Sequence, residues 1–162
     1  MSDLVFLMGA YEARFPTDRA YCTNHMWAQP QGHAHRFGFT AYAVRLLQDV
    51  YFLEWCVDEA SHLRQRQMIG CIESKKAESE LYAPADGQLV RFNETLLDDP
   101  SAINVDKYGS GWLFELQATG DNLLSPEQYL QHLDSVWEIT QRTLKGQYGK
   151  TDGGGPIPGP EQ

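Results

Sequence analysis

Two adjacent lysines stand in a short acidic segment between two apolar runs of the chain. Lys75 and Lys76 lie within residues 73–79, which separate the apolar runs 68–72 and 81–82. The β-branched and aromatic residues of these runs are typical of strands, and the polar stretch between them predicts a hairpin tip. From residue types alone, such a pair is usually a solvated loop, and covalent modification of one lysine is the rarer alternative, roughly one case in twenty.

A second group of residues has the composition of a metal site. Cys22 and His25 are spaced as Cys-x-x-His, and His33 and His35 follow as His-x-His. Thiolate and imidazole are ligands suited to zinc. The second pair lies beside a turn signal at residues 29–32, however, and a surface site here has roughly one chance in ten. We therefore expect no metal site.

Neither the cysteines nor the serines predict catalysis. Cys22, Cys56 and Cys71 show no metal-ligand spacing among themselves and cannot all pair within one chain, so we expect reduced thiols. Ser74 and Ser79 have no nearby base arranged to activate a nucleophile, and the chain has no glycine-rich phosphate cradle. The sequence predicts a protein that is not itself an enzyme.

The overall composition excludes several kinds of partner. The 162 residues are 42% hydrophobic and 22% charged, which suits one packed domain with a terminal appendage. The net charge of −9 repels phosphate backbones and anionic lipid heads, so we expect no nucleic-acid and no membrane partner. No apolar run approaches the roughly 20 residues that span a bilayer. Because the first residues resemble neither a secretory signal nor a transit peptide, we expect a cytoplasmic protein.

The hydrophobic pattern predicts a mainly β domain with short helices at its margins. The expected strands are residues 21–28, 34–39, 50–55, 68–72, 81–82, 88–92 and 112–116. The near-continuous apolar character of residues 50–55 predicts burial on both faces of that strand. Turns are expected at residues 29–32 and at Asp86-Gly87.

Three helices are marked by capping residues. Thr40 is expected to cap a short helix over residues 41–48, and Asn93 a helical turn that Pro100 stops. Ser125 opens a C-terminal helix with serine at the N-cap, proline at N1 and glutamine at N3. The apolar residues expected to pack this helix on the body are Leu130, Leu133, Trp137 and Leu144.

The chain divides into an N-terminal extension over residues 1–20, a domain over residues 21–145, and a Gly- and Pro-rich tail over residues 146–162 that we expect to be disordered. Tryptophans in such a domain are more often core anchors than surfaces for ligand stacking. The tryptophans expected to act as anchors are Trp27, Trp55, Trp112 and Trp137.

The segment around the lysines carries a family motif. Residues 73–84 read Glu-Ser-Lys-Lys-Ala-Glu-Ser-Glu-Leu-Tyr-Ala-Pro and resemble E-S-V-K-A-x-S-D/E-L/I-Y-S/A-P, the attachment motif of the glycine cleavage H-protein family. Residues 21–27 are similar to the family segment Y-T-x-x-H-E-W, and residues 38–43 and 47–54 to G-I-T-D-Y-A and L-G-D-I-V-F-V-E. The resemblance covers roughly residues 20 to 140, and this ordered combination is more specific than any single motif. The chain is identified on these motifs as a member of the family.

This resemblance implies the barrel-sandwich hybrid of lipoyl and biotinyl carriers, with short flanking helices and a C-terminal helix. It implies lipoic acid in covalent amide linkage to Lys76, which aligns with the modified position, while the family has an apolar residue where Lys75 stands. Glu73, Ser74 and Ala77 flank the attachment point in the same motif. Biotin is less expected, since biotin carriers usually flank the lysine with methionines. A hairpin tip held by rigid strands suits a swinging arm, and a lipoyl ligase or transferase is an implied partner.

The resemblance also implies a cleft that shields a cationic aminomethyl group on the arm. Asn24, His25, Met26 and Glu80 occupy the family's cleft positions. Met26 stands where the family has a carboxylate, and its apolar side chain cannot pair with a cation. Glu80 keeps the carboxylate that follows the lysine. The loss of one counter-charge weakens the prediction of aminomethyl shielding and leaves the prediction of lipoylation unchanged.

Three functions remain open from the sequence. The first, slightly favoured, is the non-catalytic carrier of glycine cleavage, with glycine decarboxylase, aminomethyltransferase and dihydrolipoyl dehydrogenase as partners. The second is an H-like lipoate-binding protein that serves another redox or sulfur-transfer complex. The third is a lipoyl-relay or interaction module. Met26 favours the second and third functions, whereas Glu80 and the overall match favour the first.

Overall fold

Strands make up most of the regular structure in the computed structural model, which describes residues 3–119 and 122–148, with side chains as far as residue 139. The strands are β1 (Leu4–Met8), β2 (Tyr11–Phe15), β3 (Ala20–Tyr21), β4 (Met26–Gln31), β5 (Ala34–Phe39), β6 (Val50–Trp55), β7 (His62–Leu63), β8 (Met68–Ser74), β9 (Glu78–Tyr82), β10 (Asp86–Phe92) and β11 (Phe114–Thr119). The helices are α1 (Ala41–Leu47), α2 (Glu94–Asp98), α3 (Ala102–Val105) and α4 (Pro126–Tyr148). The predicted mainly β class is confirmed.

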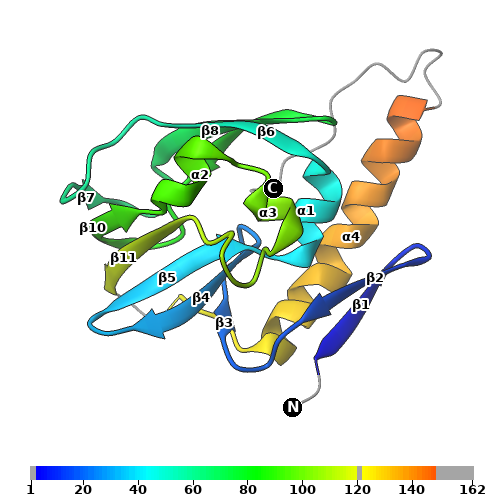
Figure 1. Cartoon of the computed structure of the whole chain (residues 1–162). Coiled ribbons are helices and arrows are strands. Elements are labelled where there is room, and N and C mark those ends of the chain that lie inside the picture. Colours follow the sequence, from blue (N-terminus) through cyan, green and yellow to red (C-terminus); the bar gives the residue numbers. More distant parts are fainter. Residues whose placement is uncertain (1–2, 120–121, 149–162) are drawn as a thin grey trace.

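Two antiparallel sheets enclose the first core. A six-stranded sheet has the order β3-β4-β5-β11-β10-β7, and a three-stranded sheet has the order β6-β8-β9. Figure 1 shows β6 and β8 on one side of the molecule and β3, β4 and β5 on the other. Buried side chains from both sheets fill the space between them, among them Leu53, Ile69, Ile72, Phe37, Phe114 and Leu116. This arrangement confirms the predicted barrel-sandwich hybrid.

The two sheets meet closely at Trp55. Its ring stacks on Phe92 of β10 with ring centroids 4.6 Å apart, and it meets Phe114 of β11 edge-on at 5.8 Å. Gly70 on the neighbouring strand β8 leaves room for this ring, because a Cβ there would lie 2.5 Å from the Glu54 carbonyl oxygen and 2.9 Å from the indole. The predicted anchoring role of Trp55 is confirmed by these contacts.

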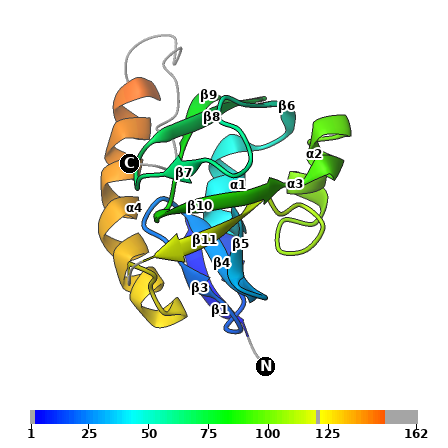
Figure 2. The same cartoon turned by 90° about the vertical axis from the view of Figure 1, so that its left-hand side faces the viewer.

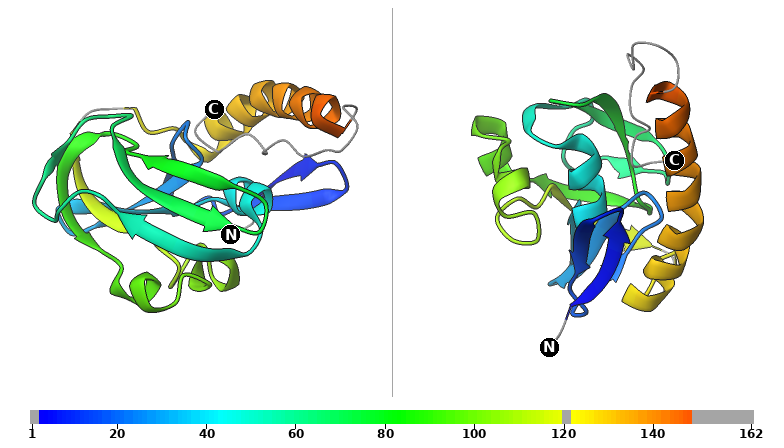
Figure 3. Two further views of the ribbon diagram at one scale, coloured as in Figure 1. Left: turned by 90° about the horizontal axis from the view of Figure 1, so that it is seen from above. Right: turned by 90° about the vertical axis from the view of Figure 1, so that its right-hand side faces the viewer.

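A second, largely aromatic core lies outside the space between the two sheets. We call it the aromatic cluster; its buried members are Phe6, Met8, Ala13, Phe15, Tyr21, Trp27, Ala41, Tyr42, Leu46, Tyr129 and Leu133. They come from the hairpin β1–β2, from α1 and α4, and from β3 and β4 of the six-stranded sheet. The hairpin, α1 and α4 lie together on one side of the molecule (Figures 1 and 3). Tyr21 stacks on Tyr129 with centroids 4.9 Å apart, and Phe15 meets both rings edge-on. Such aromatic pairs add to the free energy gained by burial.

The hairpin β1–β2 lies within the predicted N-terminal extension, where we expected no strands. Its two-residue loop turns at Gly9, whose φ of 65° is accessible to glycine without steric cost. The inward residues Phe6, Met8, Ala13 and Phe15 alternate with outward ones. The period-2 alternation and the glycine are therefore sequence signals that predict a hairpin here.

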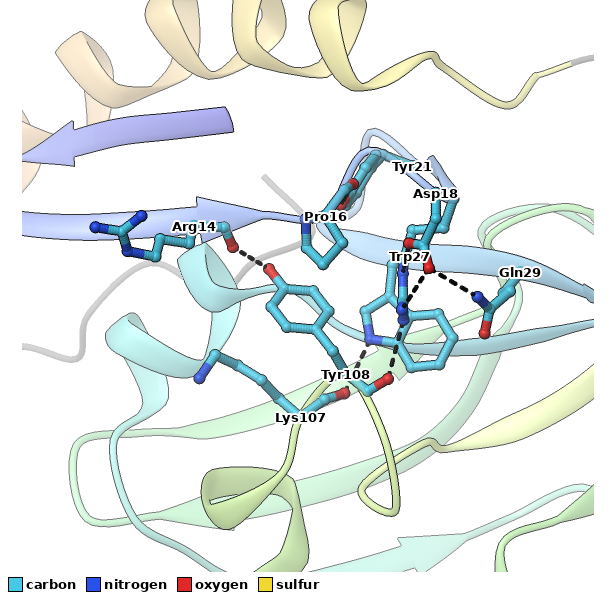
Figure 4. A network of polar contacts seen from close by, with 9 residues as sticks. Arg14, Pro16, Asp18, Tyr21, Trp27, Gln29, Lys107 and Tyr108 are labelled. Carbon is cyan, nitrogen blue, oxygen red and sulfur yellow. Dashed lines mark hydrogen bonds and ion pairs between the residues drawn. The ribbon is translucent and has the colours of Figure 1, made fainter. Parts of the chain in front are cut away.

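Polar contacts join the hairpin to the rest of the chain (Figure 4). The Tyr108 hydroxyl donates to the Arg14 carbonyl oxygen at 2.6 Å and accepts from the Ala41 amide at 2.9 Å. The Trp27 indole N–H donates to the Lys107 carbonyl oxygen at 3.0 Å. The loop before β11 thus ties β2, the start of α1 and β4 together.

The C-terminal helix begins as predicted. The Ser125 amide donates to the Gln128 side chain at 2.9 Å, and the Gln128 amide donates to the Ser125 hydroxyl at 3.1 Å, which together form a capping box. Leu133 is fully buried in the aromatic cluster, and Leu130 and Trp137 pack against it. The helix continues to Tyr148, past the predicted boundary at residue 146; Leu144 and the remainder of the predicted tail lie outside the described side chains and residues. Figure 2 shows α4 on the opposite side of the molecule from α2 and α3.

Several predicted boundaries were wrong. The strand predicted over residues 21–28 is interrupted after Tyr21 by a turn, and β4 begins only at Met26. β4 continues through the predicted turn at 29–32, since the chain reverses at Gly32 and His33 with Gln31 paired to Ala34. Asp86-Gly87 opens β10 and is not a turn, and the last strand runs from Phe114, two residues later than predicted.

The prediction that residues 50–55 are buried on both faces was also wrong. Tyr51 is 62% exposed and Phe52 39% exposed. Among the described residues the strand pairs with β8 alone, and it carries a register shift between Val50 and Phe52, which turns these rings outward. No helix among the described residues has the length and apolar character needed to cross a membrane.

Candidate functional site

The two lysines lie at the tip of the hairpin β8–β9, as predicted. The last paired residues are Glu73 and Glu78, and the tip between these strands is short. Ser74 closes β8 with 5% of its surface exposed, whereas Lys75 and Lys76 are both exposed. The tip therefore projects lysine side chains from a base that is itself buried.

Ser74 holds the backbone of the tip in one conformation. Its hydroxyl donates to the Ala77 carbonyl oxygen at 3.1 Å and accepts from the amides of Ala77 and Lys76 at 3.1 and 3.4 Å. The Ser74 amide also donates to the Ala77 carbonyl oxygen at 2.8 Å. The Ala77 side chain packs against the first core. These contacts keep the tip compact, so that a group attached to it has a fixed base.

The two lysines differ in how their backbone is held. The Lys75 amide donates to the Asp49 carbonyl oxygen at 2.8 Å, which ties this residue to the segment before β6. The Lys76 amide contacts only the Ser74 hydroxyl within the tip. Within the part of the chain that the structure describes, neither ammonium group has a hydrogen-bond or ion-pair partner. Both lysines are thus exposed, and Lys75, unlike Lys76, is tied through its amide to the segment before β6.

The outer face of the three-stranded sheet is acidic near the tip. Glu73 pairs with Glu78, and Cys71 pairs with Glu80 in the next row. Glu80 is exposed and accepts a hydrogen bond from the Tyr82 hydroxyl at 2.6 Å. Glu80 therefore lies on the surface along β9, within the hairpin that carries Lys76.

A cleft of about 580 Å³ opens where β9 ends. It is bordered by Thr23, Asn24, Gln65, Arg66, Tyr82, Ala83, Pro84 and His132. The Asn24 amide group donates to the Tyr82 carbonyl oxygen at 3.2 Å. Its Oδ1 atom is buried and has no hydrogen-bond partner among the described residues. A buried acceptor without a hydrogen-bond partner favours a ligand that brings an N–H or O–H donor.

His25 lies next to Asn24 but faces the interior. Its ring is 2% exposed and its Nδ1 lies 2.8 Å from the Tyr129 hydroxyl, which in turn lies 3.1 Å from the Thr40 hydroxyl. Burial, with a smaller contribution from His132, lowers the pKa of His25 to about 3, so the ring is neutral at physiological pH. Its φ of 71° places the backbone in the left-handed region, which lets the chain turn sharply before β4.

Met26 also faces the interior. It is 1% exposed and belongs to the first core, with Phe39 opposite it on β5. Of the four predicted cleft residues, the structure therefore brings only Asn24 to the cleft; Glu80 lies on the outer face of β9, and His25 and Met26 lie in the cores. A carboxylate placed at position 26 would be buried among apolar side chains, at a large cost in free energy.

The structure separates the residues that the sequence grouped as possible metal ligands. Cys22 is buried, and burial raises the pKa of its thiol to about 12, so it is protonated. His33 is exposed at the β4–β5 turn, far in the sheet from His25 at the other end of β4. Among the described residues, no three His, Cys, Asp or Glu side chains gather as ligands for an ion. All three cysteines are free thiols.

Most residues of the cleft and its support were not predicted from the sequence, among them Arg66, Tyr82, Tyr129 and His132. Tyr129 and His132 lie in the same helix as Leu133, and Tyr82 lies in the attachment motif. The helical spacing and the motif are therefore sequence signals that point to these three residues. Arg66 has a φ of 72°, which is uncommon for arginine, and no sequence pattern predicts its position at the cleft.

Comparison with known proteins identifies one family. The family model described as glycine cleavage H-protein matches residues 19–141. The chain is 40% identical over 117 residues to a probable glycine cleavage system H protein of Natronomonas pharaonis, covering 70% of this chain and 92% of that protein. It is 37% identical over 123 residues to the glycine cleavage system H protein of Rubrobacter xylanophilus, covering 75% of this chain and 97% of that protein.

A solved structure agrees with the sequence relatives. The crystal structure of a glycine cleavage system H protein from Mycobacterium marinum matches with a TM-score of 0.63 and 36% sequence identity, covering 71% of this chain and 95% of that chain. The hairpin β1–β2 precedes the residues that the family model matches. The motifs, the two-sheet fold and these relatives lead to one conclusion: this chain belongs to the glycine cleavage H-protein family.

Proposed function

We propose that this chain is the lipoyl carrier of a glycine cleavage system and that Lys76 carries lipoic acid in amide linkage. The observation that supports the proposal most strongly is the exposed Lys76 amine on a tip whose backbone is fixed by Ser74. A carrier must present its arm to several enzymes, so the attachment point has to be accessible while its base stays rigid. The family membership of the chain agrees with this role.

The residues of the tip fit a covalently attached group. When bound, the lipoyl group supplies a redox-active disulfide that accepts and releases the carried unit. The protein contributes the amine of Lys76, the acidic surface of half-buried Glu73 and exposed Glu78, and a rigid base for the arm. A short tether raises the effective concentration of the arm at a bound partner to the millimolar range. The proposed role is that of a carrier, with catalysis left to the partner enzymes.

The acidic surface suits partners that bring a basic face. The net charge of −9 increases the rate of encounter with such a face through long-range attraction. The proposed partners are a lipoyl ligase or transferase, glycine decarboxylase, aminomethyltransferase and dihydrolipoyl dehydrogenase, and the proposed compartment is the cytoplasm.

Asn24 and Glu80 are the proposed contacts for a cationic unit on the arm. The Asn24 Oδ1 atom is a buried acceptor at the cleft, and Glu80 offers a carboxylate on the same strand as the cleft residue Tyr82. Met26 is not part of this proposal because it lies in the core.

The test is glycine–bicarbonate exchange by a glycine decarboxylase supplied with the lipoylated protein. We expect exchange with the wild type and with Lys75→Arg, which keeps the charge at the neighbouring position, and no exchange with Lys76→Arg. Equal exchange by the lipoylated wild type and by a lipoyl-free preparation contradicts the proposal.

The lining of the cleft favours a second candidate, a lipoyl carrier for another redox complex. None of the lining side chains is a carboxylate, while Arg66 is a cation. A cationic cargo is disfavoured beside a guanidinium, whereas a neutral or anionic one is not. This candidate predicts that dihydrolipoyl dehydrogenase reoxidises the reduced arm although the protein supports no exchange with glycine decarboxylase.

A further inference from the structure

Two exposed aromatic side chains stand on β6 beside the tip that carries the lysines. Tyr51 is 62% exposed and Phe52 is 39% exposed. Phe52 pairs with Glu73 near the end of β8. Val50, at the start of β6, pairs with Ser74, the residue that closes β8. The two rings, which we call the aromatic pair, therefore lie next to the base of the tip.

The backbone beneath the aromatic pair is held in place. Tyr51 is the extra residue of the register shift between β6 and β8, and a bulge of this kind redirects the side chains of a strand. On one side, the Lys75 amide donates to the Asp49 carbonyl oxygen at 2.8 Å. On the other side, the Val50 amide donates to the Asn104 side chain at 2.9 Å. The outward position of the rings is thus fixed relative to the tip.

A third exposed apolar side chain belongs to the segment that Asn104 ties to β6. Val105 closes α3 and is 83% exposed. The Asn104 amide group also donates to the Gln48 carbonyl oxygen at 2.6 Å, so α3 is joined to the start of β6 by two hydrogen bonds. Apolar residues that are exposed singly are common, whereas exposed apolar residues on neighbouring segments are typical of interaction sites.

Carboxylates border the aromatic pair. The strands β6, β8 and β9 carry neither lysine nor arginine, and their charged residues are Glu54, Glu73, Glu78 and Glu80. Phe52, Glu73 and Glu78 follow one another across the three strands, and Glu54 lies two residues from Phe52 on the same face. Within the part of the chain that the structure describes, none of the four carboxylates has an ion-pair partner. This face complements a partner that surrounds an apolar depression with basic residues.

The place of the aromatic pair beside the tip selects the partner. In attachment, the Lys76 amine attacks the carboxyl carbon of an activated lipoyl group such as lipoyl adenylate. The amide C–N bond forms, the C–O bond to the adenylate breaks, and AMP leaves while the amine loses a proton to solvent. The attaching enzyme must therefore bring its active site to the tip itself. Enzymes that use the completed arm act on the disulfide at its far end and need not approach the tip as closely.

We propose that the aromatic pair is the docking site for the enzyme that attaches the lipoyl group, with the bordering glutamates facing basic residues of that enzyme. This inference rests on the proposed function, since it requires attachment at Lys76. Aromatic side chains buried at the centre of an interface contribute much of its binding free energy. Charges at the rim mainly raise the rate of encounter. The aromatic pair thus supplies affinity, and the glutamates speed association.

The experiment measures lipoylation of the full chain by a purified lipoyl ligase with ATP and lipoate. Initial rates at several carrier concentrations, followed by intact mass, give kcat and KM. We expect kcat/KM lower by at least about tenfold in the double variant Tyr51→Ser/Phe52→Ser, mainly through a higher KM, because the amine and its support remain. Tyr51→Ser alone, at the more exposed position, is expected to lower kcat/KM in the same direction.

The matched control is Val90→Ser. Val90 is 43% exposed, close to the value for Phe52, but lies on β10 of the six-stranded sheet. It is expected to keep the wild-type kcat/KM. Circular dichroism compares the strand content of the variants. After complete lipoylation with excess ligase, the double variant is expected to match the wild type in reduction of its arm by dihydrolipoyl dehydrogenase.

Three results would contradict the docking proposal in different ways. Equal kcat/KM for the wild type, Tyr51→Ser and the double variant overturns it and leaves attachment at Lys76 standing. Normal lipoylation of the double variant with slower reduction of its arm also overturns it, because the surface then serves an enzyme that uses the arm. Absence of lipoylation in the wild type contradicts the proposed function itself, and the docking proposal with it.

Discussion

The tip of the hairpin β8–β9 and the aromatic cluster differ in burial and in the contacts that hold them. At the tip, Lys75 and Lys76 are exposed, and the base is held by the hydrogen bonds of one hydroxyl group. In the aromatic cluster, Phe15, Tyr21 and Tyr129 are fully buried and packed ring against ring. The tip joins residues that are neighbours in sequence, whereas the cluster joins the first residues of the chain to its last helix.

Because of this difference, substitutions in the two regions are expected to affect different properties, lipoyl attachment at the tip and stability in the aromatic cluster. A substitution at the tip removes an accessible amine and few packing contacts, so we expect loss of attachment with a nearly unchanged free energy of unfolding. A substitution in the aromatic cluster leaves the amine in place and creates a cavity, so we expect the reverse. Variants in each region test whether lipoyl attachment and stability are affected separately.

The largest effect on stability is expected from Phe15→Ala. Phe15 is completely buried with its ring edge-on to both Tyr21 and Tyr129, and truncation of a buried phenylalanine costs about 3–5 kcal/mol of the free energy of unfolding. Urea unfolding followed by tryptophan fluorescence measures this loss. Leu7→Ala on the same hairpin is the control, since Leu7 is 58% exposed and its truncation is expected to change the free energy by less than about 0.5 kcal/mol. Equal losses in the two variants contradict a role of the hairpin as part of a core.

The next effect depends on pH and concerns His25. Its pKa is lowered to about 3 in the folded protein, chiefly by burial, while an unfolded histidine has its pKa near 6.5. Below pH 6.5 the unfolded chain therefore binds a proton that the folded protein excludes. The contribution of His25 to stability is complete above pH 6.5 and falls by up to about 1.4 kcal/mol per pH unit as the pH drops toward 3.

The variant His25→Asn isolates this contribution. Asparagine tolerates the φ of 71° at this position and can still form a hydrogen bond with the Tyr129 hydroxyl, but it does not titrate. We expect the free energy of unfolding of the variant to fall less steeply between pH 6.5 and pH 4.5 than that of the wild type. His33→Asn, at an exposed turn, is expected to keep the wild-type slope. Superimposable pH profiles for the wild type and His25→Asn would show that His25 is not the titrating group.

The smallest effect is expected from Ser74→Ala at the base of the tip. The variant loses the hydroxyl that donates to the Ala77 carbonyl oxygen and accepts from two amides. A loss of about 1 kcal/mol is expected from chemical unfolding, together with slower lipoylation because the tip is less well defined. Ser79→Ala on β9 is the control and is expected to match the wild type in both measurements. A normal rate of lipoylation in Ser74→Ala would mean that the rigidity of the tip is unimportant for the ligase.

The sequence predicts the local elements of the fold well. The cap at Thr40, the helix after it, the strand over residues 50–55 and the hairpin tip at the lysines all depend on neighbouring residues, and all are confirmed. The capping box at Ser125 is confirmed for the same reason. Capping hydrogen bonds and the alternation of apolar and polar residues involve neighbours in the chain, so they can be recognised from the sequence.

The parts that the sequence did not predict depend on distant partners. His25 meets Tyr129 across 104 positions of the chain, and this contact gives the buried histidine beside the cleft a polar partner. The outward rings of Tyr51 and Phe52 result from a register shift in the pairing with β8, which no pattern within residues 50–55 reveals. The burial of Met26 depends in the same way on Phe39 of the neighbouring strand. Of the cleft residues named from the family motif, Asn24 lines the cleft, whereas the rest of the lining comes from distant segments that the motif does not name.

The most direct test of the central claim is the intact mass of the protein after expression with lipoate and a lipoyl ligase. Three proteins are compared: the wild type, Lys76→Arg and Lys75→Arg, in which either exposed amine of the tip is replaced with retention of charge. Attachment at Lys76 predicts a gain of one lipoyl amide in the wild type and in Lys75→Arg, and no gain in Lys76→Arg. A gain in Lys76→Arg, or none in any of the three proteins, would contradict the assignment of Lys76 as the attachment point.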